Sequence, residues 1–477
     1  MKNKIISVPL LLLLIISAAR FYIERDTNFS MSSLNLTLIT SIIGIVLFLI
    51  NVVKQEKFSL LRNNLLSIGV LFVLGFYIVH FFEYLGYSLH LKETIKDMQL
   101  YNHNNINSAA ICSLSCLLAF LISYIGFPAH PFTKYNSDRT ITVSRTRILD
   151  IFQIVFLFSF YYFTDKRYFM TGGIGLFSNV LGFSLTSYMS QTFFIAVTLS
   201  QSVLRLYTKR VSSFHQYASS YSIAYYLCVL VFILFMLLSG DRGPIMYIIL
   251  AYGCVYYCKI KKGVGLFKGI VILVLAAYVM NFLGFLRATE GDLSAQKIEQ
   301  VQKRLNEDYS NEKSLIFSST TELSYVVRAY HLIYDYTETN GTVYGLSFLN
   351  NLLGIIPGIR PLIIYPILGI SEADARSVDT AYLSTRLLGS DHGMGTTCVA
   401  DSYFNFGFVG SLILFFSFGI LMRRLDVSIY SNHSGVVVMS FAICFLCFSV
   451  YLGRSSFFSP LNLSVYTSII TYLIMHK

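Results

Sequence analysis

The sequence predicts an all-α polytopic membrane protein with about twelve transmembrane helices. Only 13% of its 477 residues are charged and 55% are hydrophobic, whereas soluble domains carry about 25% charged residues. Long apolar runs recur along most of the chain, and a helix of about 20 residues crosses the roughly 30 Å hydrocarbon layer. These runs lack the polar/apolar alternation of barrel strands. Helices are therefore the spanning structure that satisfies the backbone in lipid.

Each predicted span is an apolar run bounded by polar or turn-forming residues. The predicted spans are residues 5–19, 34–53, 64–87, 107–127, 148–164, 176–202, 221–239, 244–258, 264–286, 402–422, 435–452 and 457–475. The first run also resembles a secretory signal peptide, because MKNK precedes it and the small residues Ser17, Ala18 and Ala19 end it. Cleavage there leaves the orientation of the later spans unchanged.

Lysine and arginine residues predict the orientation of these spans. If the N-terminus is cytoplasmic, the cytoplasmic segments hold more than twice as many of these residues as the short outer connections. Short cytoplasmic loops carry such an excess, so we expect both termini in the cytoplasm. The net charge of +11 is then a signal of topology, and it does not indicate nucleic-acid binding.

The predicted topology divides the chain into three segments. Residues 1–286 contain transmembrane helices one to nine, 287–401 form a large outer (periplasmic) loop, and 402–477 contain helices ten to twelve. The loop carries a net negative charge, so the positive charge of the chain lies in the remaining segments. The loop is the one place long enough to build a site outside the membrane.

Three stretches of the large loop have recognisable character. Residues 294–306 are polar and helix-prone, and 321–336 have the apolar spacing of an amphipathic helix lying on the membrane, with His331 on it. Residues 347–370 are apolar enough for a further span, but Arg360 and three prolines interrupt them. A re-entrant or interfacial hairpin fits better, because broken backbone is tolerated at membrane depth where it lines a cavity.

Arginine residues stand at several predicted outer boundaries of the membrane. They are Arg242 in the turn SGDRGP, Arg287, Arg360 within the apolar hairpin, and Arg454. Each is either an interfacial anchor or part of a diphosphate site, because the guanidinium fork suits phosphate oxygens. An arginine at apolar depth is a functional candidate. Further candidates are Asp241, Arg376 and Asp391.

A second candidate site precedes the tenth span. It reads Asp391-His392-Gly-Met-Gly-Thr-Thr, and Asp401 follows where the span begins. Glycines let backbone amides approach a ligand, and histidine exchanges protons near neutral pH. We therefore consider His392, Asp401 and Arg360 as catalytic candidates. His392 or Asp401 would receive a proton, and Arg360 would stabilise a leaving diphosphate.

Motifs for other chemistries are missing from the sequence. There is no Walker lysine motif, no dinucleotide-binding glycine fingerprint, no HExxH and no zinc-like cysteine spacing. We therefore expect no metal and no cofactor. The cytoplasmic connections are also too short for a nucleotide-binding domain. A reaction at the outer face would need a donor that carries its own activation, such as a polyprenyl diphosphate-linked glycan.

Three motifs together resemble a known family. They are GDRGP at 240–244, GIIPGIRP at 354–361 and HGMGTTCVADSYFNFGFVG at 392–410, and they are similar to those of the O-antigen polymerases, the Wzy-type oligosaccharide repeat unit polymerases. The resemblance implies a GT-C-like glycosyltransferase in the bacterial inner (cytoplasmic) membrane. It would transfer a glycan from undecaprenyl diphosphate onto a new lipid-linked repeat unit, alongside a chain-length regulator and a flippase. The spaced Arg…Gly pairs of some members are missing from the long loop.

Two alternatives remain open at this point. An O-antigen ligase would move the finished glycan to another acceptor, and a lipid-linked oligosaccharide flippase would transport it. A flippase should bury charges in the middle of its spans, whereas this sequence has few, Glu83 being one. The unusual residues are concentrated in one outer loop, which favours an enzyme.

Overall fold

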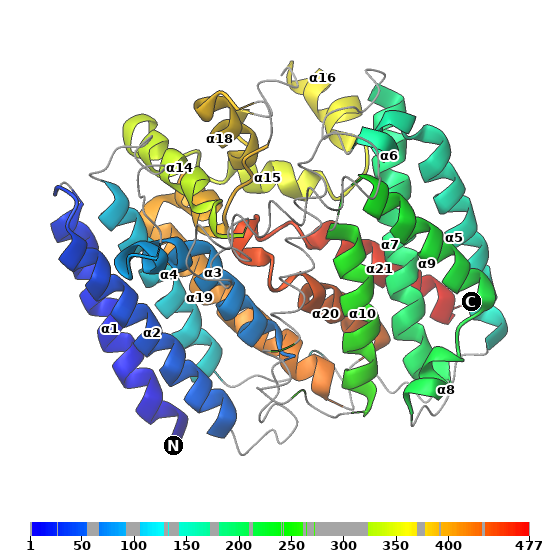
Figure 1. Cartoon of the computed structure of the whole chain (residues 1–477), viewed down its shortest axis with the longest axis horizontal. Helices are drawn as coiled ribbons and strands as arrows, with labels where there is room; N and C mark the ends of the chain where they lie inside the picture. The colour runs from blue at the N-terminus through cyan, green and yellow to red at the C-terminus, as the bar shows by residue number, and fades with distance from the viewer. Residues whose placement is uncertain are drawn as a thin grey trace. The chain divides into compact units, whose positions relative to one another are not determined.

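The computed structural model shows a helical protein (Figure 1). It describes residues 2–25, 27–54, 66–91, 105–127, 143–171, 181–208, 213–239, 243–260, 323–369, 377–390, 393–431 and 435–476, with single positions 132, 241, 264 and 271. Within these ranges there are helices and turns and no β-strand. The all-α part of the predicted fold is thereby confirmed.

Every predicted span except one coincides with a described helix. The exception is 264–286, which lies outside the described residues apart from positions 264 and 271. By length and composition, five described helices can cross a membrane: Ser7–Glu24, Met31–Val52, Ile68–Ser88, Ile106–Gly126 and Cys398–Tyr430. Four shorter apolar helices accompany them, Ile223–Ser239, Gly243–Tyr257, Val436–Phe448 and Leu461–Met475. The chain is an integral membrane protein, and the number of spans stays a prediction.

The described helices form two compact units. Unit 1 comprises Met1–His130, Glu312–Asp426 and Ser449–Ser459, and unit 2 the remainder. The elements of unit 1 are α1 (Lys2–Glu24), α2 (Met31–Lys54), α3 (Ile68–Ser88), α4 (Ile106–Gly126), α14 (Val327–Asn340), α15 (Leu346–Leu353), η3 (Arg360–Ile364), α16 (Tyr365–Leu368), α18 (Thr380–Leu388), most of α19 (Cys398–Tyr430) and η4 (Leu452–Arg454).

Unit 2 contains the other described helices. They are α5 (Val143–Phe163), α6 (Lys166–Thr171), α7 (Leu181–Thr208), α8 (Phe214–Ala218), α9 (Ile223–Ser239), α10 (Gly243–Ile260), α20 (Val436–Phe448) and α21 (Leu461–His476). Helices α5 and α7 share a buried polar ladder in which Gln201 donates to Asp150 and to Gln153, and Gln153 donates to Thr198. Polar side chains inside an apolar bundle thus satisfy one another.

The long helices of unit 1 differ in how much surface they bury. Inside unit 1, 89% of the residues in the apolar window of α4 are buried, against 17% for α1. Helix α4 is therefore central, whereas α1 presents Leu12, Ile15 and Ile16 outward, each more than half exposed. A large exposed apolar surface is costly in water, so these side chains fit lipid.

One end of unit 1 collects the short helices. There the end of α3 meets the start of α2, where Ser88 donates to Asn35, and the start of α4 meets the end of α1, where Ser108 donates to the Glu24 and Arg25 carbonyls. Asn105, before α4, also bonds Asp335 of α14. We call this the α14 end. Helices α14, α15 and α18 lie there beside the ends of the long helices (Figure 1).

The opposite end of unit 1 is closed by a charged cap. The Asp426 carboxylate in α19 accepts hydrogen bonds from the Ile68 and Gly69 amides at the start of α3, at 2.7 and 3.1 Å, and from the Tyr124 hydroxyl at 2.6 Å. The first amides of a helix have no partner within it and carry partial positive charge. Asp426 therefore stabilises α3 and ties α4 and α19 to it.

Helix α14 corrects one expectation about the large loop. Residues 321–336 were expected to form a helix lying on the membrane, but α14 begins at Val327 and its apolar face packs into unit 1. Tyr330, His331 and Tyr334 are buried there. An apolar face with a 3.6-residue period can pack on a membrane or on other helices. Here it packs on α4 and α18.

The apolar stretch after α14 is a broken helix. Helix α15 ends at Leu353, turns occupy 354–358, and η3 and α16 follow. Gly358, with φ +75°, lies at the bend. We call residues 346–369 the α15–α16 hairpin. Pro357 lies in these turns, whereas Pro361 and Pro366 lie near the starts of η3 and α16. The position of this stretch relative to a membrane stays a prediction. The predicted helix at 294–306 lies outside the described residues.

Candidate active site

Asp401 is the centre of a buried polar cluster at the α14 end. It stands in the first turn of α19 and is only 1% exposed. Its Oδ1 accepts a hydrogen bond from the Ser347 hydroxyl of α15 at 2.7 Å, and its Oδ2 accepts one from Ser456 at 2.5 Å. Both carboxyl oxygens are thus engaged by separate segments of the chain.

Asn405, one turn further along α19, completes the cluster. Its side-chain nitrogen donates to the Asp401 carbonyl at 2.7 Å and to the Ser347 hydroxyl at 2.6 Å, and its side-chain oxygen accepts from the Ser347 amide at 3.2 Å. We call Ser347, Asp401, Asn405 and Ser456 the Asp401 junction. Because a buried polar group without a partner costs about 1–3 kcal/mol, this reciprocal arrangement holds the start of α15 firmly on α19.

The residues after Asn405 bend α19 and pack the hairpin on it. Gly407 has φ +65°, which interrupts the helical geometry. Left-handed backbone of this kind favours glycine. The Phe406 ring lies edge-on to Phe348 of α15, with 5.4 Å between ring centroids. In the run Asn405-Phe406-Gly407, the first residue therefore forms hydrogen bonds to α15, the second packs against it, and the third bends α19.

Arg454 is brought to the junction by the turn that follows α20. It ends η4, only two residues before Ser456, and it is half-buried. The turn lies directly on α3. A Cβ at Gly75 would be 2.1 Å from the Val450 carbonyl oxygen, and one at Gly453 would be 3.1 Å from the Phe76 Cα. Two glycines thus allow the backbones to touch, and this contact positions Arg454.

We expect Gly75→Ala to reduce function through this contact. The added methyl group meets backbone atoms and must push the turn, and with it Arg454 and Ser456, away from α3. We predict loss of most surface polymer, scored on a polysaccharide gel, together with a lower melting temperature of the purified protein. Gly253→Ala in α10 is the matched control, because nothing lies within 4 Å of a Cβ there. Equal behaviour of the two variants would contradict this view of the turn.

Arg360 lies against its own hairpin. Its Nη1 donates to the Asn350 carbonyl at a long 3.4 Å, and a Cβ at Gly354 would stand 2.9 Å from its Nη2. No carboxylate among the described residues forms an ion pair with it. The hairpin is joined to the junction by Ser347 and by Phe348, whose ring centroid is 4.8 Å from that of Phe458. The segments that carry Arg360, Asp401 and Arg454 therefore meet at the junction.

The glycine-rich segment before α19 is clamped by α18. Thr385 accepts from the Met394 amide at 3.0 Å, Ser384 donates to the Gly395 carbonyl at 3.0 Å, and the hydroxyls of Thr380 and Thr396 are 2.7 Å apart. Gly395 has φ +77°. The segment therefore has a defined path into Asp401. Asp391 and His392, which precede it, lie outside the described residues.

The other candidates divide between unit 2 and the residues that are not described. Asp241 belongs to unit 2 and accepts a hydrogen bond from the Tyr168 hydroxyl at 3.2 Å. Arg242, Arg287 and Arg376 lie outside the described residues. Their assignment to a diphosphate site, like that of His392 to proton transfer, stays a prediction.

Comparison with known proteins identifies the family. The model of the family described as O-antigen polysaccharide polymerase Wzy matches residues 4–476, nearly the whole chain. The chain belongs to the Wzy family. Searches of curated proteins and of solved structures each gave no significant match. The resemblance read from the three motifs is therefore confirmed, and with it a glycosyltransferase-like polymerase of O-antigen polysaccharide in a membrane.

One ion pair in this Wzy protein was missed by reasoning from the sequence. Arg25, just after α1, donates to Glu338 of α14, 313 positions away, and the Tyr403 hydroxyl of α19 donates to the same carboxylate. Tyr403 also stacks on Tyr334, with ring centroids 4.7 Å apart. Glu338 therefore links α1, α14 and α19 beside the Asp401 junction. Such pairings depend on tertiary contacts that no local pattern encodes.

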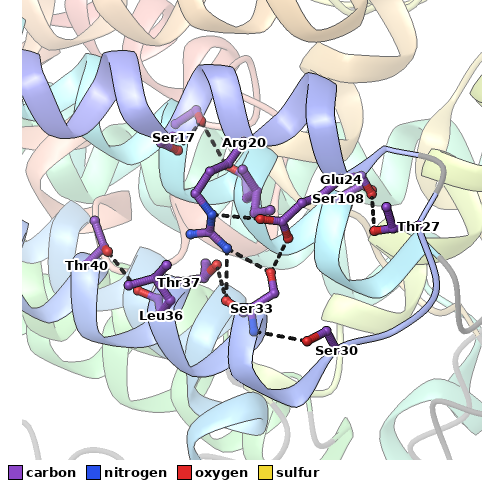
Figure 2. A network of polar contacts seen from close by, with 12 residues as sticks. Ser17, Arg20, Glu24, Thr27, Ser30, Ser33, Leu36, Thr37, Thr40 and Ser108 are labelled. Atoms are coloured by element: carbon purple, nitrogen blue, oxygen red, sulfur yellow. Dashed lines mark hydrogen bonds and ion pairs between the residues drawn. The ribbon is translucent and has the colours of Figure 1, made fainter.

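A second polar network at the same end fixes the first two helices. The Arg20 guanidinium donates to Glu24 at 2.9 Å and to the hydroxyl and carbonyl of Ser33 at 2.7 and 3.1 Å, and Ser33 donates to Glu24 (Figure 2). Ser108 of α4 reaches the carbonyl of Glu24 in the same group. Because the network immediately precedes Arg25, it orients the residue that pairs with Glu338.

His331 is a structural residue in the described arrangement. It is 1% exposed, and its Nε2 shares a hydrogen bond of 2.5 Å with the Tyr84 hydroxyl of α3. Burial lowers the pKa of His331 from 6.5 to about 4, because an apolar surrounding disfavours the charged imidazolium. Nearby, Ser324 donates to Glu83 of α3. These contacts attach α14 to α3.

The lowered pKa predicts that acid destabilises the protein through His331. The unfolded histidine binds a proton below about pH 6.5 and the folded one only near pH 4, so stability falls as pH drops through this window. From pH 7.5 to pH 5 the loss of stability from this residue is about 2 kcal/mol. Melting temperatures at pH 7.5 and 5.0 should differ less in His331→Gln than in the natural protein. Exposed His215→Gln is the control, and an unchanged difference in His331→Gln would refute the prediction.

Proposed function

We propose that the protein joins undecaprenyl diphosphate-linked oligosaccharide repeat units into O-antigen at the periplasmic face of the bacterial inner membrane. Membership of the Wzy family supports the polymerisation. The observation that carries the assignment of the site is the Asp401 junction, which connects the segments bearing Arg360 and Arg454. Two arginines on segments that meet at the Asp401 junction suit the binding of a diphosphate leaving group.

The proposed reaction transfers one glycan in each step. A hydroxyl oxygen at the non-reducing end of the acceptor attacks the anomeric carbon of the donor glycan, and the bond from that carbon to the diphosphate oxygen breaks. The hydroxyl proton passes to a base, and the electron pair leaves with undecaprenyl diphosphate. One glycosidic bond forms for each carrier released. The donor supplies its own activation, and the residues of this site can act without metal or cofactor.

The candidate residues take separate roles in this proposal. Arg360 and Arg454, with Arg242 and Arg287 from outside the described ranges, stabilise the charge that develops on the diphosphate. His392 receives the proton. Asp401 positions the others, because both of its carboxyl oxygens already accept hydrogen bonds from serine hydroxyls. Asp241, Arg376 and Asp391 stay as subsidiary candidates around the same function.

The outer location rests on charge and on helix direction. The excess of lysine and arginine on one side favours cytoplasmic termini. Hydrogen bonds at the α14 end join the end of α3 to the start of α2, and the end of α1 to the start of α4. These helices therefore alternate, as the predicted topology requires, which supports an outward-facing site. We further propose a GT-C-like fold, a chain-length regulator and a flippase as partners.

Surface polysaccharide from a deletion strain tests the function. Loss of this protein should leave single repeat units on the lipid A core, and the natural chain supplied in trans should restore a ladder on a gel. Free polymer that no longer reaches the core would instead indicate a ligase. Lipid-linked units that accumulate facing the cytoplasm would indicate a flippase, and either outcome would overturn the proposal.

A further inference from the structure

The α15–α16 hairpin exposes a continuous apolar surface. Leu346, Leu349 and Leu352 of α15 are 53%, 52% and 42% exposed. Because they are three residues apart, they form one stripe on a short helix. In η3 and α16, Leu362 and Ile367 are 67% and 75% exposed. The opposite side of α15 is buried through Ser347 and Phe348, so the exposed stripe is the face turned away from the protein.

This surface continues onto a membrane-spanning helix. Phe406 of α19 contacts Phe348 of α15, and Val409 and Ile413, one and two turns further along α19, are 56% and 63% exposed. Helix α19 is among those long and apolar enough to cross a membrane. Hydrocarbon is the medium that covers such a helix. The apolar surface that α19 presents to hydrocarbon therefore continues over the hairpin.

One cation adjoins this apolar surface. Arg360 is the sole charged residue in 346–369, and it is half-buried where η3 begins. Gly354 leaves room for its guanidinium against the bend. Among the described residues its Nη1 donates a hydrogen bond to the Asn350 carbonyl, at 3.4 Å. The Arg360 guanidinium therefore has donors available for phosphate oxygens, and it lies beside an apolar surface. Such a combination is complementary to a molecule with a phosphate head group and a hydrocarbon tail.

We propose that the isoprenoid chain of the lipid-linked substrate lies along this surface, on Leu349, Leu352, Val409 and Ile413, with its diphosphate at Arg360. This inference deepens the proposed function and rests on it. The hairpin is then a re-entrant element that admits the carrier from the bilayer to the Asp401 junction. Helix α15 has eight residues, and η3 and α16, which follow one another directly, have five and four. These elements are too short to cross the membrane.

The chain contains no tryptophan, so a single introduced tryptophan reports on one position. We would prepare Leu352→Trp and Val409→Trp, both at exposed positions, with Ile15→Trp, 57% exposed on α1, as the matched control. Each full-length protein is reconstituted in vesicles of brominated phosphatidylcholine, whose bromine quenches tryptophan in contact with acyl chains. Unbrominated undecaprenyl diphosphate is then added, with inorganic diphosphate as a second control.

The proposal predicts quenching at all three positions. Undecaprenyl diphosphate should restore most of the fluorescence at residues 352 and 409 and leave residue 15 unchanged, inorganic diphosphate should have no effect, and Arg360→Ala should abolish the recovery. Equal recovery at residue 15, or none anywhere, would mean that ordinary lipid covers the surface. Quenching of residue 352 by aqueous iodide in place of bromolipid would place the hairpin in water. Each of these results overturns the proposal.

Polymer formation in cells separates this inference from the proposed function. If the natural chain makes a normal ladder but the tryptophan reporters show no specific recovery, the binding surface is wrong and the polymerase assignment stands. If recovery is specific but the natural chain does not restore the ladder in a deletion strain, the polymerase assignment is wrong. Two reporter positions on different helices guard against a single variant that fails to fold.

Discussion

Cells that carry Arg360→Ala will display single repeat units in place of long O-antigen chains, while the protein itself stays in the membrane at normal abundance. Arg360 adjoins the apolar surface of the hairpin, and among the described residues no carboxylate neutralises it. Removing one donor that stabilises a developing charge costs about 3 kcal/mol, a loss of a hundredfold or more in rate. A polysaccharide gel with an immunoblot of the membrane fraction measures both quantities.

Two further variants sharpen the test of Arg360. Arg360→Lys keeps the charge but loses the planar fork, so we expect chains of intermediate length. Arg386→Ala is the matched control, because Arg386 is an exposed arginine of α18 in the same large loop, and it should give a normal ladder. Full-length chains from Arg360→Ala, or equal shortening by Arg386→Ala, would show that Arg360 does not act on the substrate.

Asp401→Ala is expected to cause the largest loss of stability among the junction variants. The change removes the buried carboxylate that accepts hydrogen bonds from the buried Ser347 hydroxyl and from the half-buried Ser456 hydroxyl. An unsatisfied buried donor costs about 1–3 kcal/mol, so the total is about 3 kcal/mol or more. Asp401→Asn keeps the shape and one acceptor oxygen, and it should lose less. Melting temperature of the purified protein and ladder length in cells are the two measurements.

The partners of Asp401 distinguish positioning from direct proton transfer. If Asp401 positions the hairpin, Ser347→Ala combined with Ser456→Ala will reproduce most of the Asp401→Ala phenotype, and the triple variant will add little, because the three residues share one network. Asp379→Ala, which removes the cap of α18, should cost about 1 kcal/mol and serves as the control. A stable Asp401→Asn protein with no polymer, beside an active double serine variant, would instead make Asp401 the base.

Apolar periodicity predicted the helices well but not their partners. Uninterrupted apolar runs must be helical in lipid, and hence the predicted spans outside 264–286 coincide with described helices. Charges were read as span ends, so the tenth span was expected to stop at residue 422. Helix α19 continues to Tyr430, because Asp426 caps α3 and Arg423 lies 5.2 Å from the ring centroid of Tyr124. Those partners are distant in the sequence.

The candidate site was predictable in type and only partly in arrangement. Asp401 was a candidate because the tenth predicted span begins directly after it, whereas Asn405 appeared only within the motif at 392–410, and both belong to the junction. Ser347 and Ser456 carry no sequence signal, since a serine becomes important here only through a contact across 54 or 55 positions. The Arg25–Glu338 pair was missed for the same reason.

Reconstitution of the purified natural chain with lipid-linked repeat units tests the central claim most directly. In vesicles without nucleotide, and with metal ions chelated, the account predicts a ladder of lipid-linked chains. It also predicts one undecaprenyl diphosphate released for each new glycosidic bond, with both products lost in Arg360→Ala. A ladder that requires a nucleotide, or polymer that forms equally well with Arg360→Ala, would contradict it.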